Sequence, residues 1–70
     1  MPEMMYVDSS NIEAVGYDAG SQELHVRFLG GGYYVYHQVP RHIFDDFLNA
    51  PSKGSFLNRE IRNVYQFTKQ

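Results

Sequence analysis

Cysteine and tryptophan are both absent from this chain of 70 residues. Without cysteine, the chain can form no disulfide and no thiolate metal site. Long apolar runs are missing as well, because no stretch approaches the ~20 apolar residues that a membrane-spanning helix needs. The chain begins Met1-Pro2-Glu3, and the acid is unlike the positive start of a secretory signal. We therefore expect a small cytoplasmic protein.

A large excess of charge is also lacking, since the net charge is only −2. The charge is divided unevenly, however. Residues 1–50 hold two arginines against seven carboxylates, a net charge of −5, whereas residues 51–70 hold four basic residues against one carboxylate, a net charge of +3. Any attraction for an anion is therefore expected from the last twenty residues. A solvated helix face is the more ordinary interpretation of so few charges.

Aromatic residues are plentiful, at 16% of the chain, and all are phenylalanine or tyrosine. A chain of this length is near the size at which a single core is only just sufficient. Each aromatic ring buries a large area, so a dense aromatic core is the expected substitute for disulfides. We expect one domain over residues 9–70. Residues 1–8 have no clear period and are expected to be loosely ordered, or to pair as an edge strand.

Three stretches have the residue types of β-strands, at residues 12–17, 24–29 and 33–36. The second alternates apolar and polar residues most clearly. In the first, the apolar residues change phase along the stretch, which predicts a β-bulge near Ala14 or Gly16. The three stretches together predict an antiparallel meander.

Three consecutive glycines separate the second and third predicted strands and indicate a turn. A loop over residues 30–32 would place Phe28 opposite Tyr34 and Val26 opposite Tyr36. A loop one residue shorter would bury the other face of the third strand, because a slip of one residue exchanges the two faces. We expect the three-residue loop, since it buries two tyrosine rings.

Apolar residues at helical spacing predict a helix over residues 41–48, ended by Pro51. A second helix is expected to begin at Ser52 or Ser55, because either serine can cap it. Residues 65–67 either form a short strand or simply pack. The predicted fold is α+β, a three-stranded antiparallel meander with two C-terminal helices packed on one face. The core is expected to contain Val26, Phe28, Tyr34, Tyr36, Phe44, Phe47 and Ile61.

Four short motifs follow one another along the chain: Ser9-Ser10-Asn11-Ile12, Gly16-Tyr17-Asp18, Tyr34-Val35-Tyr36 with Val39-Pro40, and Ser52-Lys53-Gly54-Ser55-Phe56-Leu57-Asn58 with Ile61-Arg62. Their order and spacing resemble the KTSC domain, over about residues 9–67. This module is named for its occurrence at the C-terminus of some lysyl-tRNA synthetases, and it also occurs as small bacterial proteins. The family has no established activity. The resemblance implies only a suggestion of RNA binding, drawn from the synthetase context.

The start of the second predicted helix is the sharpest candidate site. Helix N-termini present unpaired N–H groups, glycine allows a close backbone approach, and lysine adds a charge. Residues one helical turn apart share a face, so further polar side chains can join them. The residues expected to hold a phosphate, from RNA or a nucleotide, are Lys53, Gly54, Ser55, Asn58, Arg59 and Arg62. An ordinary helix cap explains the same residues equally well.

The outward face of the sheet offers weaker candidates. Tyr33 is the expected outward ring and the stacking candidate there. His25 and His37 are expected opposite one another on this face, exposed and without a third metal ligand. No spacing in the chain predicts a catalytic triad or a carboxylate pair. We therefore expect no enzyme activity, no metal and no cofactor.

Two functions follow from these patterns. The first is a non-enzymatic module that binds RNA or another phosphate-bearing ligand weakly. The second is a protein-interaction module or homodimer, which would use an open edge strand or the outward face with Leu29, Tyr33 and Val35.

Overall fold

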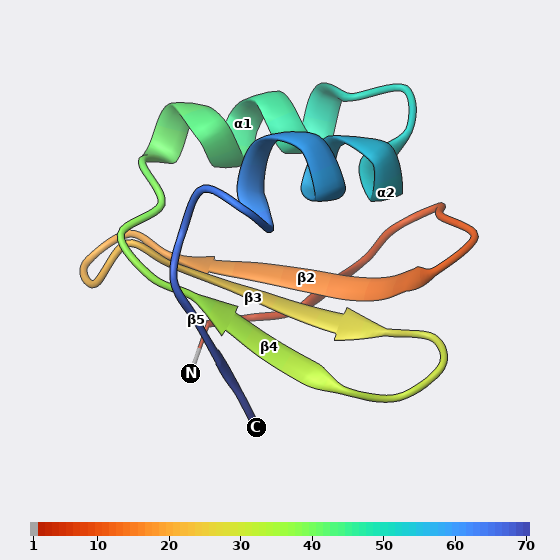
Figure 1. Ribbon diagram of the computed structural model, residues 1–70, viewed down its shortest axis with the longest axis horizontal. Helices are drawn as coiled ribbons and strands as arrows, with labels where there is room; N and C mark the ends of the chain where they lie inside the picture. Colours follow the sequence, from red (N-terminus) through yellow and green to blue (C-terminus); the bar gives the residue numbers. More distant parts are fainter. Residues whose placement is uncertain (1) are drawn as a thin grey trace.

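A computed structural model describes residues 2–70. The chain forms an antiparallel sheet whose one face is covered by helices (Figure 1). Met1, the first residue of the segment expected to be loosely ordered, lies outside the described residues. None of the helices in the described part of the chain has the length and apolar character to cross a bilayer.

The sheet has five strands rather than the predicted three. They are β1 (Met5–Tyr6), β2 (Ile12–Asp18), β3 (Glu23–Phe28), β4 (Tyr33–Tyr36) and β5 (Phe67–Lys69), and they lie side by side in that order. The predicted meander of β2, β3 and β4 is confirmed, but the three-stranded sheet was wrong because β1 and β5 add a strand at each edge. These edge strands have two and three residues, all exposed. The sequence predicted edge pairing of the N-terminal segment and a strand over residues 65–67 only as alternatives, and the C-terminal strand begins at the last of these residues, Phe67.

The predicted bulge in β2 is confirmed. The register between β2 and β3 shifts between Ile12 and Ala14. The extra residue brings Ile12 onto the same face as Val15, and both side chains are fully buried.

The hairpin of β3 and β4 has a register two residues away from the predicted one. Val26, and not Phe28, lies opposite Tyr34, and Leu24 lies opposite Tyr36. A shift of two residues leaves every side chain on its own face of the sheet. The predicted buried face is therefore correct, although the predicted partners are wrong.

The loop of this hairpin explains the shift. The backbone N–H of Phe28 donates to the carbonyl oxygen of Gly32 at 3.1 Å, so the loop is residues 29–31 rather than residues 30–32. Gly31 and Gly32 have φ angles of 98° and 99°, a conformation that favours glycine. Gly32 therefore belongs to the paired end of the hairpin.

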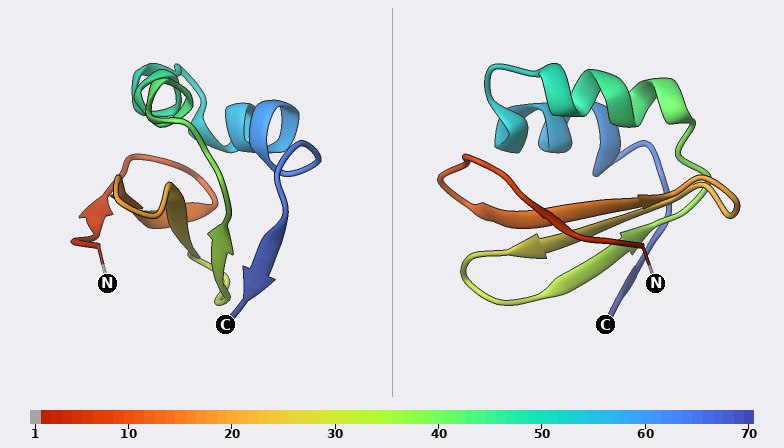
Figure 2. Two further views of the ribbon diagram at one scale, coloured as in Figure 1. Left: turned by 90° about the vertical axis from the view of Figure 1, so that its left-hand side faces the viewer. Right: turned by 180° about the vertical axis from the view of Figure 1, so that it is seen from behind.

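The helices cover one face of the sheet, as the end-on view in Figure 2 shows. They are α1 (Arg41–Asn49), α2 (Lys53–Phe56) and the π-helix η1 (Leu57–Ile61), which continues α2 directly. The predicted first helix is confirmed to within a residue. Of the two proposed caps, Ser52 begins the second helix, and its hydroxyl accepts the N–H of Ser55 at 3.3 Å.

The core lies between the sheet and the helices. It consists of Ile12, Val15, Leu24, Val26, Tyr36, Val39, Phe44, Phe47, Leu57 and Ile61. Phe28 and Tyr34, which were predicted in the core, are only partly buried and pack at its edge. Tyr17 of β2 packs against α1, because its ring stacks on Phe44. Its hydroxyl also donates to the carbonyl oxygen of Val39, just before α1, at 2.6 Å.

Candidate functional site

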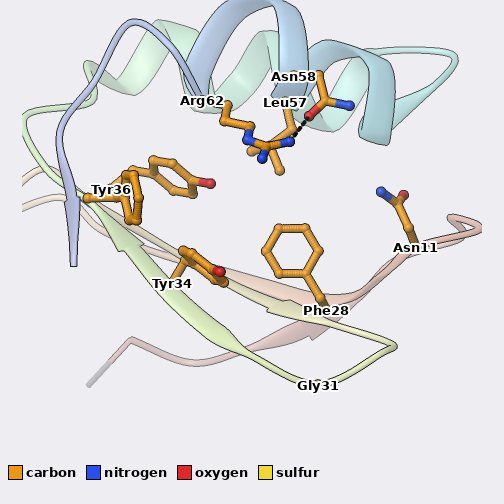
Figure 3. Close-up of a pocket in the computed structure, with 9 residues that line it drawn as sticks. Asn11, Phe28, Gly31, Tyr34, Tyr36, Leu57, Asn58 and Arg62 are labelled. Atoms are coloured by element: carbon orange, nitrogen blue, oxygen red, sulfur yellow. Dashed lines mark hydrogen bonds between the residues drawn. The ribbon is translucent and has the colours of Figure 1, made fainter. Parts of the chain in front are cut away.

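A cleft of about 330 Å³ opens between the sheet and the helical segment formed by α2 and η1 (Figure 3). We call it the aromatic cleft. Its lining residues are Asn11, Phe28, Gly31, Tyr34, Tyr36, Leu57, Asn58, Arg62 and Phe67. The volume is at the lower end of the range for small-molecule sites.

Four aromatic rings form the sheet side of the aromatic cleft. Tyr34 and Tyr36 point to the same face of β4 and stack with ring centroids 6.4 Å apart. Phe28 meets Tyr34 edge-on at 5.4 Å. Phe67 comes from β5, is about half exposed, and lies against both tyrosines at 5.4 and 5.8 Å. This side of the cleft is therefore lined by four adjoining aromatic rings.

Asn58 and Arg62 form the helical side of the aromatic cleft. The guanidinium Nη1 of Arg62 donates to the side-chain oxygen of Asn58 at 3.3 Å. The backbone N–H of Arg62 donates to the carbonyl oxygen of Leu57, five residues earlier, which is the π-helical bond. Among residues 2–70, no carboxylate forms a salt bridge with Arg62. Its charge is therefore available to a ligand.

The hydroxyl of Tyr36 lies deep in the aromatic cleft. Tyr36 is only 2% exposed, and its side chain points into the cleft (Figure 3). Within residues 2–70 this hydroxyl makes no hydrogen bond, and it is open to water in the cleft. Burial raises the pKa of Tyr36, and the guanidinium of Arg62 partly offsets that rise. The hydroxyl is therefore neutral near pH 7 and can both donate and accept.

Asn11 lies at the other end of the aromatic cleft, in the loop before β2. The hydroxyl of Ser9 donates to its side-chain oxygen at 3.0 Å, which leaves the amide nitrogen facing the cleft (Figure 3). Gly54 lies against Asn11, because a Cβ at position 54 would be 2.5 Å from the Asn11 oxygen. The sequence prediction of the site missed Asn11. Its place in one of the family motifs was the only available signal.

The other residues predicted to hold a phosphate lie outside the aromatic cleft. Lys53 directs its ammonium group to a backbone carbonyl at 3.5 Å. Ser55 is engaged in the helix cap. Arg59 pairs with the carboxylate of Glu60 at 2.9 Å. Of the six residues predicted to hold a phosphate, only Asn58 and Arg62 line the cleft.

Tyr33, His25 and His37 lie on the opposite face of the sheet. The prediction that His25 is exposed was wrong, since it is 5% exposed and its Nδ1 lies 2.8 Å from the hydroxyl of Tyr33. His37 does not lie opposite His25, whose partner across the sheet is Val35. Both imidazoles instead approach the carboxylate of Glu23, at 3.5 and 3.6 Å. The described residues hold no group of three ligating side chains suited to a metal ion.

A model of the KTSC domain matches residues 8–65 of this chain. The chain belongs to the KTSC domain family. All residues that line the aromatic cleft, apart from Phe67, fall within the matched range. The resemblance on which the sequence prediction rested is therefore confirmed.

Relatives of this KTSC domain occur both as small proteins and within larger ones. A protein of Tsukamurella paurometabola is 53% identical over 59 residues, which cover 84% of this chain and 88% of that protein. The crystal structure of a KTSC domain protein from Yersinia pestis superposes with a TM-score of 0.96 at 31% identity, covering 100% of this chain and 99% of that one. A lysine–tRNA ligase of Nostoc punctiforme is 35% identical over 60 residues, which are 86% of this chain but only 11% of the ligase.

Proposed function

We propose that this KTSC domain is a non-enzymatic module that binds RNA or another phosphate-bearing ligand in the aromatic cleft. One observation carries the proposal: the guanidinium of Arg62, free of any carboxylate partner within residues 2–70, stands beside a surface of four aromatic rings. A guanidinium matches the geometry of a phosphate, and aromatic rings stack on bases.

The polar groups of the aromatic cleft suit an anionic ligand. They are the two amides, the two phenols and the guanidinium, and no carboxylate or histidine of the described chain lines the cleft. A second positive charge is close, since the ammonium group of Lys69 lies 5.9 Å from the centre of the Tyr34 ring. With so few cationic groups, affinity is expected to be weak and to fall as salt rises. No group of the cleft lining is placed to act as a general base, which favours binding over catalysis.

The relatives add independent support for RNA as the ligand. The lysine–tRNA ligase of Nostoc punctiforme carries a segment similar to this domain in about a tenth of its length. A domain that accompanies a tRNA-acting enzyme is well placed to contact RNA. For the present chain, RNA binding is our proposal and rests on the cleft.

A titration of the ¹⁵N-labelled protein with short single-stranded RNA, nucleotides and sulfate at low salt tests the proposal. We expect shift changes in η1 and at Tyr34 and Phe67, and affinity that falls steeply as salt is added. Arg62→Gln should weaken binding about tenfold or more, because it removes a charge-assisted hydrogen bond.

Arg59→Gln is the matched control. It removes the same charge from the same helical segment, but Arg59 is paired with Glu60 outside the cleft. It should therefore weaken binding only slightly. Absence of any binding at low salt, or equal losses in Arg62→Gln and Arg59→Gln, would count against the proposal.

A homodimer through the edge strand β5 is a second candidate. Phe67 is 51% exposed on β5, which is an edge strand of the sheet formed by residues 2–70 and could pair with another strand on its outer side. The outward sheet face is less suitable than the sequence indicated, because Val35 is buried there and Tyr33 is bonded to His25. Sedimentation equilibrium from micromolar to millimolar protein tests this candidate, and a constant monomeric mass would remove it.

A further inference from the structure

We infer that a nucleotide enters the aromatic cleft base first, that the hydroxyl of Tyr36 pairs with the polar edge of the base, and that the phosphate stays at the mouth beside Arg62. This inference rests on the proposed function and adds to it a binding direction and a residue that determines specificity.

Tyr36 and Arg62, two polar residues that line the aromatic cleft, differ in exposure. Tyr36 belongs to the buried core at 2% exposure, whereas Arg62 is exposed. In Figure 3 the hydroxyl of Tyr36 points inward, while Arg62 extends from the helical segment above it. A charged phosphate is costly to bury, whereas a planar base loses little by leaving water for an aromatic surface. The phosphate therefore belongs at Arg62 and the base belongs beside Tyr36.

The hydroxyl of Tyr36 has hydrogen-bonding capacity that the protein does not use. Tyr17 is a useful comparison, because it lies on the same face of the sheet and its hydroxyl donates to the carbonyl oxygen of Val39 at 2.6 Å. The Tyr36 hydroxyl has no such partner in residues 2–70, and it reaches the open cleft, where water can bond to it. A ligand that enters the cleft displaces this water, so an apolar group placed there would leave the hydroxyl unpaired, whereas a polar group would replace the lost hydrogen bond. The hydroxyl therefore discriminates between ligands by what they carry at the buried end.

The chemistry of the unpaired group specifies what the buried end of the ligand must carry. A phenol can donate and accept, and the amide of Asn11 faces the same space from the other end. A base edge offers donors and acceptors, whereas a plain phenyl ring offers neither. Nucleotides should therefore bind more tightly than phenyl phosphate, which has the same charge and an aromatic ring but no polar edge.

The test compares four nucleoside 5′-monophosphates, phenyl phosphate and inorganic phosphate on the intact protein by NMR titration. The wild type should bind at least one nucleotide about tenfold more tightly than phenyl phosphate, the value of one hydrogen bond. Tyr36→Phe should lower the affinity of the preferred nucleotide to that of phenyl phosphate and leave the melting temperature nearly unchanged, because the hydroxyl makes no hydrogen bond within residues 2–70. Tyr17→Phe, the matched control, should lower the melting temperature and keep the preference.

The outcomes separate this inference from the proposed function. If Arg62→Gln weakens nucleotide binding but Tyr36→Phe does not, the binding direction is wrong and the proposed function stands. If the wild type binds phenyl phosphate as tightly as every nucleotide, the inference is overturned without any variant. If neither RNA nor any nucleotide binds at low salt, both the inference and the proposed function fail.

Discussion

Gly54 lies directly against the side chain of Asn11, so close that a Cβ atom at position 54 would be 2.5 Å from the amide oxygen. The contact joins the first turn of α2 to the loop before β2. Asn11 also lines one end of the aromatic cleft, so this contact lies beside the cleft. The glycine is needed for this packing, since any side chain at position 54 would meet Asn11.

Gly54→Ala should therefore destabilise the protein by about 1–3 kcal/mol, because the added methyl group displaces Asn11 or α2. The gain in helix propensity, up to about 1 kcal/mol, offsets only part of this. Urea denaturation measures the effect. Gly30→Ala is the control, since a Cβ there meets nothing within 4 Å. In an Asn11→Gly background, Gly54→Ala should cost much less stability. An equal loss in both backgrounds would show that the contact with Asn11 is not the cause.

Ser52→Ala should destabilise the protein by about 1 kcal/mol without affecting the cleft. The hydroxyl of Ser52 accepts the N–H of Ser55 at 3.3 Å and also bonds its hydroxyl at 3.1 Å. Loss of such a cap has this typical cost. Thermal melts and ligand titrations together check the prediction, with the exposed Ser10→Ala as control. Weaker binding at unchanged stability would show instead that the cap segment contacts the ligand.

Tyr17→Phe should cost about 1 kcal/mol near neutral pH, since it removes the bond to Val39. The loss should shrink as the pH rises above 10. Burial raises the pKa of Tyr17 above its ordinary value of 10.0, with Arg41 opposing the rise, so the unfolded chain ionises first. The stabilisation is complete below pH 10 and disappears as the pH rises through the folded-state pKa. Urea midpoints of both proteins at several alkaline pH values measure it, and a constant gap would contradict it.

Gly16→Ala should loosen the N-terminal segment. A Cβ at position 16 would be 2.8 Å from both the carbonyl oxygen of Glu3 and the sulfur of Met4. The segment must move away, and its pairing should weaken at the backbone bond from Val7 to Glu13, which is 3.1 Å long. Hydrogen exchange at the Val7 amide should become faster.

Gly20→Ala is the control for this substitution, because its nearest contact would be an ordinary 3.4 Å. If exchange at the Val7 amide is unchanged or slower in Gly16→Ala, the pairing of the N-terminal segment does not depend on this glycine.

Much of the architecture could be predicted because it follows from local periodicity. Alternation identified β3, apolar spacing identified α1, and a change of phase identified the bulge near Ala14. The buried face of β4 was also predicted correctly. The predicted partners across that hairpin were wrong, because composition marks three glycines as a turn without saying which of them still pairs.

The candidate site was predictable only in part. Helical spacing placed Asn58 and Arg62 on one face, and they do line the aromatic cleft. Tyr36 was assigned to the core, where it lies, but nothing in its sequence context indicated that its hydroxyl would be left without a partner. Asn11 and Phe67 were missed because each reaches the cleft from a distant part of the chain.

Local patterns along the chain were therefore enough to predict which residues form the central strands and helices and which face of each is apolar, because those properties depend on neighbours a few positions away. The edge strands, the burial of His25 and the opening beside Tyr36 came from the folded arrangement alone. Each of these depends on a contact between distant segments. The strand β5 pairs with β4, the N-terminal segment packs on Gly16, and η1 lies over the sheet beside the cleft. Such contacts are set by packing and backbone pairing between distant segments, and these produce no hydrophobic periodicity in the local sequence.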